Sequence, residues 1–105
     1  MKEAVINSEG GLIEVTLDCE IDHHAAKKIR ESVDSALVYH RPRELVLDFS
    51  CVSFMDSSGI GLVMGRFKNL QKNGAKLHLV NLSDNIYKIM KLAGIERLAV
   101  IEKGA

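Results

Sequence analysis

The sequence predicts a single α/β domain with a mainly parallel sheet and the element order ββαβαβαβ. After an opening hairpin, short apolar runs typical of strands alternate with segments whose apolar residues recur at helical spacing. The links between these segments are short, which implies right-handed crossovers between parallel strands. With 105 residues, 47% of them hydrophobic and 27% charged, the chain can build one core without staples, so we expect one domain over residues 1–105.

The strands of the N-terminal half differ in their patterns. Residues 4–7 and 12–17 flank the polar turn SEGG and read as a hairpin. Apolar and polar residues alternate along 12–17, so one face of this strand is expected to lie in the core and the other in solvent. Residues 45–49, LVLDF, form a nearly continuous apolar run, which predicts a strand covered on both faces.

The first helix is expected to begin at Asp22, whose carboxylate can accept hydrogen bonds from backbone N–H groups one turn on. It should run to about Val38 and be broken by Pro42. Five small or apolar residues at helical spacing are expected to face inward: Ala26, Ile29, Val33, Ala36 and Leu37.

The C-terminal third repeats the alternation of strand and helix. A second helix should end near Gly74, which can adopt the left-handed conformation that follows many helices. Residues 76–80, KLHLV, form the next strand. Ser83 is then expected to cap a short helix that closes at Gly94, and residues 98–101, LAVI, supply the last strand.

Composition excludes several classes of function. Fourteen basic residues balance fourteen acidic ones, aromatic residues make up 5% and tryptophan is absent, so binding of nucleic acid or membranes is not expected. The N-terminal residues lack an apolar signal core, which favours a cytoplasmic location. Cys19 and Cys51 lie in apolar surroundings without CxxC spacing, so we expect two buried free thiols.

The most informative stretch is residues 54–67, FMDSSGIGLVMGRF, which opens the second helix. Asp56 is the expected N-cap, and Ser57, Ser58 and Gly59 would form the first turn. Met55 and Ile60 then occupy the two positions of a hydrophobic staple. This arrangement would hold the Ser58 hydroxyl at the tip of the helix.

Two stripes are predicted on this helix. The core stripe is Ile60, Val63, Met64, Phe67 and Leu70. The opposite, small and smooth stripe is Ser58, Leu62, Gly65 and Asn69, with Gly61 beside it. One interpretation is a docking surface in which Gly61 and Gly65 let a partner backbone approach. The alternative is that DSSG is only a helix cap and that the glycines serve packing within the chain.

A phosphoryl group on Ser58 would meet the positive end of the helix dipole, which favours an anion by about 0.3–1 kcal/mol at exposed sites. The fold of the domain would therefore tolerate a phosphoryl group on Ser58. A docked partner would have to accommodate roughly −1.5 to −2 units of new charge beside Asp56 and Asp22. We therefore expect such a modification to prevent docking without unfolding the domain.

The FMDSSGIGLVMGRFK block, together with EIDHHAAKKI after the second strand, resembles the STAS-domain anti-sigma factor antagonists. Within these, the chain is most similar to antagonists of the sporulation anti-sigma-F factor, and the resemblance covers nearly its whole length. One departure is Cys19, where the family usually has glycine.

The resemblance implies a protein that is a substrate and not an enzyme, without cofactor or metal. Its unphosphorylated form would bind an anti-sigma factor that is also a serine kinase and so release the sigma factor. That kinase would phosphorylate Ser58, and a serine phosphatase would reverse the reaction. The expected partner-binding residues are Asp22, Asp56, Ser57, Gly59, Ile60, Gly61, Leu62 and Gly65.

Three other interpretations start from the same residues. The chain could be a STAS regulator of a general-stress or stressosome-type switch with a different kinase. It could be a small hydrolase using Ser58, although no motif supplies a basic partner residue. Asp22, His23 and His24 could suggest a metal site, but adjacent helical side chains diverge by about 100°, so surface or capping roles are favoured.

Overall fold

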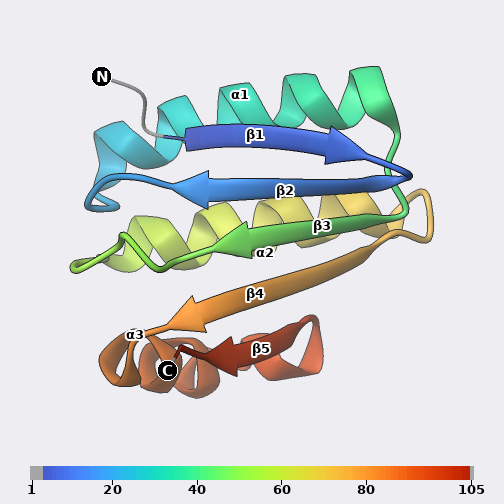
Figure 1. Cartoon of the computed structure of the whole chain (residues 1–105). Helices are drawn as coiled ribbons and strands as arrows, with labels where there is room; N and C mark the ends of the chain where they lie inside the picture. The colour runs from blue at the N-terminus through green and yellow to red at the C-terminus, as the bar shows by residue number, and fades with distance from the viewer. Residues whose placement is uncertain (1–3, 105) are drawn as a thin grey trace.

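Five strands form one sheet in the order β1-β2-β3-β4-β5 in a computed structural model that describes residues 4–104 (Figure 1). β1 is antiparallel to β2, and every later neighbour is parallel. The predicted mixed sheet and element order are therefore confirmed. The strands are β1 (Ala4–Glu9), β2 (Leu12–Leu17), β3 (Glu44–Asp48), β4 (Lys76–Leu82) and β5 (Val100–Lys103).

The helices follow the parallel strands one by one. They are α1 (His23–His40), α2 (Ser57–Gln71), α3 (Asp84–Leu92) and the 3₁₀ turn η1 (Ile95–Arg97). Each parallel strand adds beside the one before it, so right-handed crossovers return on the same side of the sheet. Figure 1 shows α1 and α2 side by side behind the sheet, both running from the end where β2 and β3 finish. Within residues 4–104, no helix combines the length and apolar character needed to cross a bilayer.

The core lies between the sheet and these helices. Leu45 of β3 pairs in register with Ile13 of β2 and Leu77 of β4, and all three are at most 2% exposed. α1 adds the buried residues Ala25, Ala26, Ile29, Val33 and Leu37 to the same layer. Each fully buried large aliphatic side chain contributes about 1.5–3 kcal/mol, so this layer is the main source of the domain's stability.

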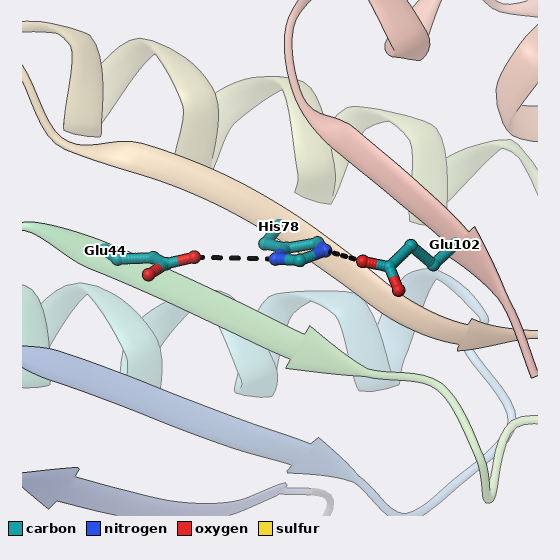
Figure 2. A network of polar contacts seen from close by, with 3 residues as sticks. All are labelled: Glu44, His78 and Glu102. Atoms are coloured by element: carbon teal, nitrogen blue, oxygen red, sulfur yellow. Dashed lines mark hydrogen bonds and ion pairs between the residues drawn. The ribbon is translucent and has the colours of Figure 1, made fainter.

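The other face of the sheet is open, which corrects the expectation that β3 is covered on both faces. Glu44, Val46 and Asp48 point away from the helices, and Val46 is shielded to 8% exposure between neighbouring strands, not by a second layer. The linear strand order explains this, because all crossovers fall on one side. Figure 2 shows His78 on this face, between Glu44 and Glu102.

The helix and turn signals are confirmed at most positions. Gly10 and Gly11 adopt φ of 59° and 84° between β1 and β2, as a two-residue hairpin turn requires. Ser83 accepts a hydrogen bond from the backbone N–H of Ile86 at 3.2 Å and so caps α3. Gly74, after α2, has φ of 69°. α1 continues two residues beyond Val38, to His40.

Two local expectations were wrong. The last strand is β5, Val100–Lys103, because residues 95–97 form a 3₁₀ turn that delays its start past the predicted residues 98–101. Cys51 is exposed and not buried, because it lies in the turn where the chain leaves the sheet after β3. Cys19 is partly buried, and neither cysteine forms a disulfide.

Candidate functional site

Helices α1 and α2 begin next to each other at one end of the sheet. Ile21 and Met55, the residues just before the two N-caps, form an isolated parallel bridge. The Ile21 N–H donates to the Phe54 carbonyl at 2.9 Å, and the Asp56 N–H donates to the Ile21 carbonyl at 3.1 Å. The bridge brings the two helix starts together, so both positive dipole ends lie at the same edge of the molecule.

Each helix start carries an aspartate, as the sequence predicts. The Asp22 carboxylate accepts from the Ala25 N–H at 2.8 Å, and the Asp56 carboxylate accepts from the Ser58 N–H at 2.8 Å. Both carboxylates therefore satisfy backbone groups that the first helical turn leaves without partners. The cap on α2 fixes the backbone of Ser58, the residue expected to be modified.

Gly59 is required in this turn for steric reasons. A Cβ atom at Gly59 would lie 2.2 Å from Cγ of Met55 and 2.3 Å from its Sδ. The Met55 side chain is 6% exposed and occupies the space that any larger residue at position 59 would need. The close contact therefore makes Gly59 part of the core beneath Ser58.

A cleft of about 370 Å³ lies between the two helices, beside Ser58. We call it the α1–α2 cleft. Ser58 is partly buried and so lies in the wall of an accessible cavity, neither sealed in the core nor fully exposed. The cleft is lined by His23, Ala26, Lys27 and Arg30 of α1 and by Ser58, Gly61 and Leu62 of α2.

The ionisable residues that line the cleft are all basic. His23, Lys27 and Arg30 recur at i, i+4 and i+7 and so share one face of α1. Within residues 4–104, neither Lys27 nor Arg30 forms an ion pair. Lys27 and Arg30 therefore put positive charge on the wall of the cleft without a carboxylate of the described chain within ion-pair distance.

A fourth basic residue, Arg66, lies further along the seam between the helices and is paired with an acid. Arg66 of α2 is 6% exposed, and its Nε lies 2.9 Å from Oδ1 of Asp34 on α1. Burial lowers the pKa of Arg66, Asp34 opposes that change, and the positive charge of Arg30 adds to it. Asp34 also accepts from the Asn69 amide at 3.2 Å, so its charge is engaged with α2.

The buried and exposed faces of α2 are rotated about the helix axis relative to the two predicted stripes. Leu62, expected on the open side, is 5% exposed, whereas Met64, expected in the core, is 38% exposed. The physical reason is that α2 packs against α1 as well as the sheet, so the side carrying Leu62 and Arg66, where Arg66 contacts Asp34 of α1, is buried too. The exposed face of α2 is Ser57, Gly61, Met64 and Lys68, flanked by the partly buried Ser58, Ile60 and Gly65.

Gly61 and Gly65, unlike Gly59, do not serve packing within the described chain. A Cβ atom built at Gly61 or at Gly65 would meet no other atom within 4 Å. This favours the docking interpretation over the alternative of internal helix packing. Two apolar side chains that the sequence did not single out as a surface lie nearby: Phe54, 51% exposed, and Met64. Helical spacing places Met64 on the predicted core stripe, so periodicity alone does not reveal that this side chain is exposed.

A family comparison identifies the class of this domain. The STAS-domain profile matches residues 3–103, nearly the whole chain. The chain belongs to the STAS-domain family. Its sequence relatives include an anti-sigma F factor antagonist of Paenibacillus polymyxa, 28% identical over 87% of this chain and 78% of the relative. An anti-sigma-B factor antagonist of Listeria monocytogenes is 33% identical over 86% of this chain and 78% of the relative.

Solved structures agree with that grouping. The anti-sigma factor antagonist SpoIIAA in its unphosphorylated form superposes with a TM-score of 0.82 at 28% identity, over 93% of this chain and 86% of the other. The Bacillus SpoIIAA in its phosphorylated form gives a TM-score of 0.75 at 28% identity, over 93% and 89%. The protein is thus a STAS domain of the anti-sigma factor antagonist type, a class of regulatory binding proteins.

The Ser58 hydroxyl has no side chain positioned to activate it among the described residues. Among the described residues, the Ser58 hydroxyl makes no hydrogen bond to a histidine or carboxylate that could remove its proton. A nucleophilic serine needs such a base within hydrogen-bond distance. In this STAS domain, Ser58 is instead held by its backbone and displayed beside a basic cleft.

Proposed function

We propose that this STAS domain is an anti-sigma factor antagonist controlled by phosphorylation of Ser58. Its unphosphorylated form binds an anti-sigma factor that is also a serine kinase, and so releases the sigma factor. The kinase then phosphorylates Ser58, which ends the binding, and a serine phosphatase restores the active form. The observation that carries the proposal is the position of Ser58, which is fixed at the start of α2 beside an accessible cleft.

The surface around Ser58 has the character of a docking site. Exposed apolar side chains of Phe54 and Met64 flank a smooth patch at Ser57 and Gly61. Gly61 has open space in front of it, so a partner backbone can approach α2 closely. We place the partner contact on this patch, with Asp22 and Asp56 at its edge and Ile60 and Gly65 at its flanks. Leu62 supports the patch from beneath, because its side chain is buried.

Phosphorylation would end docking by charge and solvation. A phosphoserine adds roughly −1.5 to −2 units of charge near pH 7. An apolar partner surface pressed against that group would have to remove its water, and burying an unpaired charge is strongly unfavourable. The domain itself keeps its fold, since the group is attached outside the core.

The sigma circuit is proposed to be that of sporulation, as in the anti-sigma F factor antagonist that the chain resembles. The general-stress circuit is a second candidate, because the anti-sigma-B factor antagonist of Listeria monocytogenes is similarly close in sequence. Both assignments place the protein in the cytoplasm, and neither involves a cofactor, a metal, nucleic acid or a membrane.

The test pairs the protein with an anti-sigma-F kinase and, separately, an anti-sigma-B kinase. Each mixture is given ATP and read by intact and peptide mass spectrometry. We expect one phosphate, located on Ser58, with the kinase of the correct circuit. Ser58→Ala should abolish it, and the neighbouring Ser57→Ala should not.

Binding is measured in the same series. A pull-down in the presence of ADP should retain the kinase, and pre-phosphorylated protein should lose it. Phosphate on Ser57, or transfer from neither kinase, would contradict the proposal.

A further inference from the structure

We infer that the α1–α2 cleft is a phosphate-binding site for the chain's own phosphoserine: the phosphoryl group on Ser58 turns into the cleft and is bound there by Lys27 and Arg30. The inference rests on the proposed phosphorylation of Ser58. It adds that α1 supplies the acceptor, so the modified form is held in a defined state.

The cavity is the right size and is next to the modified atom. Ser58 is itself one of the lining residues of the cleft, so a group bonded to its hydroxyl is already at the wall. The volume of about 370 Å³ admits a phosphoryl group together with several waters, each of which occupies about 30 Å³ in the liquid.

The two cationic side chains of the cleft have no carboxylate partner among the described residues. Lys27 and Arg30 lie one turn apart on α1 and have no ion-pair partner within residues 4–104. The guanidinium group can bind two phosphate oxygens at once, and the ammonium group supplies a second, mobile cation. Arg66, further along the seam, already has Asp34 as its ion-pair partner, so Lys27 and Arg30 are the cations left for a phosphate.

The nearby carboxylates are engaged elsewhere and would steer the phosphate towards the cleft. Asp34 contacts Arg66 and Asn69 across the seam. Asp22 caps α1 through the Ala25 N–H, and Asp56 caps α2 through the Ser58 N–H. A phosphoryl group pointing back over the cap would meet the Asp56 carboxylate, whereas one pointing into the cleft meets two cations. The second orientation is electrostatically favoured.

The test installs phosphoserine during translation, by suppression of an amber codon at position 58, so that no kinase is involved. The second pKa of the phosphate, about 6 in free phosphoserine, is measured by ³¹P NMR titration. Nearby cations favour the dianion, so we expect a value lower by about 0.5–1 unit than in the same phosphoprotein carrying Lys27→Gln and Arg30→Gln. Circular dichroism checks that α1 is intact in the double variant.

A matched control places phosphoserine at position 57, which is exposed and outside the cleft lining. Its pKa should respond less than half as much to the same two substitutions. Equal pKa values with and without Lys27 and Arg30 would overturn the inference, because the start of α2 alone would then account for the phosphate's environment. The two tests are independent. Equal pKa values would not affect the outcome of the kinase experiment, and a failed kinase experiment would not affect the pKa values, because the phosphoserine is installed without a kinase.

Discussion

The α1–α2 cleft and the open face of the sheet both carry charged residues, but they differ in how those charges are satisfied. On the sheet face, His78 lies between Glu44 and Glu102 from the neighbouring strands, with its Nδ1 3.5 Å from Glu44 Oε2 (Figure 2). In the cleft, Lys27 and Arg30 have no such partner within the described chain.

The sheet face continues that pattern at its other end. Asp48 of β3 accepts from the Asn81 amide at 3.0 Å and from the Ser50 N–H at 2.9 Å. Charges that pair across strands stabilise the sheet slightly and leave little for a ligand. Unpaired charges beside a modifiable hydroxyl retain their capacity for binding. The comparison therefore assigns a structural role to the sheet face and a binding role to the cleft.

The largest effect is expected where the cleft meets the core. Leu62→Glu would place a carboxylate at a position that is 5% exposed. The lost burial of leucine and the desolvation of the carboxylate, only partly offset by Lys27 and Arg30 across the cleft, should lower the free energy of unfolding by about 2–5 kcal/mol. Urea unfolding followed by circular dichroism measures the loss. Met64→Glu, on the exposed side of the same helix, should change it by less than about 1 kcal/mol, and equal losses would show that the rotation of α2 is misassigned.

A smaller loss is expected from the pair that joins the two helices. Asp34→Ala removes the group that faces Arg66 Nε and leaves the buried guanidinium without an anion. Because the Asp34 side chain is 36% exposed, we expect about 1–3 kcal/mol of lost stability, below the value for a fully buried pair. Arg66→Met should cost less than Asp34→Ala, since it leaves no unpaired charge. The reverse ranking in urea melts would show that the pair is only a surface contact.

The residues in these two predictions also separate the features that can be predicted from sequence from those that cannot. The element order, the caps at Asp22, Asp56 and Ser83, and the turns at Gly10 and Gly74 follow from rules that act over a few residues, and they were predicted. The location of Ser58 in the first turn of α2 came from the same local rules. The position of Ser58 in the fold could therefore be predicted without coordinates.

The exposed face of α2 and the basic wall of the cleft could not be predicted from such local rules. Arg66 would normally be assigned to solvent, but it is buried against Asp34 of another helix, on the same side of α2 as the buried Leu62, while Met64 is exposed. The basic wall of the cleft depends on α1 and α2 starting at one edge, which the bridge between Ile21 and Met55 establishes. Such contacts join segments far apart in the chain, so helical periodicity alone cannot reveal them.

Gly61→Ala separates stability from docking. A Cβ atom there has open space, and alanine favours helix over glycine, so the free energy of unfolding should rise by about 0.5–1 kcal/mol. If a partner backbone packs against this position, the added methyl group should weaken kinase binding by about tenfold, equivalent to about 1.4 kcal/mol. Gly65→Ala, equally unobstructed but one turn further from Ser58 at the flank of the proposed contact, should give the same gain in stability with a smaller loss of kinase affinity. Unchanged kinase affinity for Gly61→Ala, measured by calorimetry, would place the interface elsewhere.

The smallest effect concerns the paired charges of the sheet face and depends on pH. Burial acts to raise the pKa of Asp48, but the hydrogen bonds from Asn81 and Ser50 outweigh it and hold the pKa below its ordinary value. A carboxyl group with a lowered folded-state pKa stabilises the protein above its unfolded pKa of about 3.9, and that contribution disappears as the pH falls through the folded value. Wild type should therefore exceed Asp48→Asn in stability by less than about 1 kcal/mol at pH 7, and the difference should shrink below about pH 4. A difference that grows on acidification would mean that the Asp48 carboxylate is not stabilised by its neighbours. The sheet face would then no longer be an example of satisfied charges to set against the unpaired charges of the cleft.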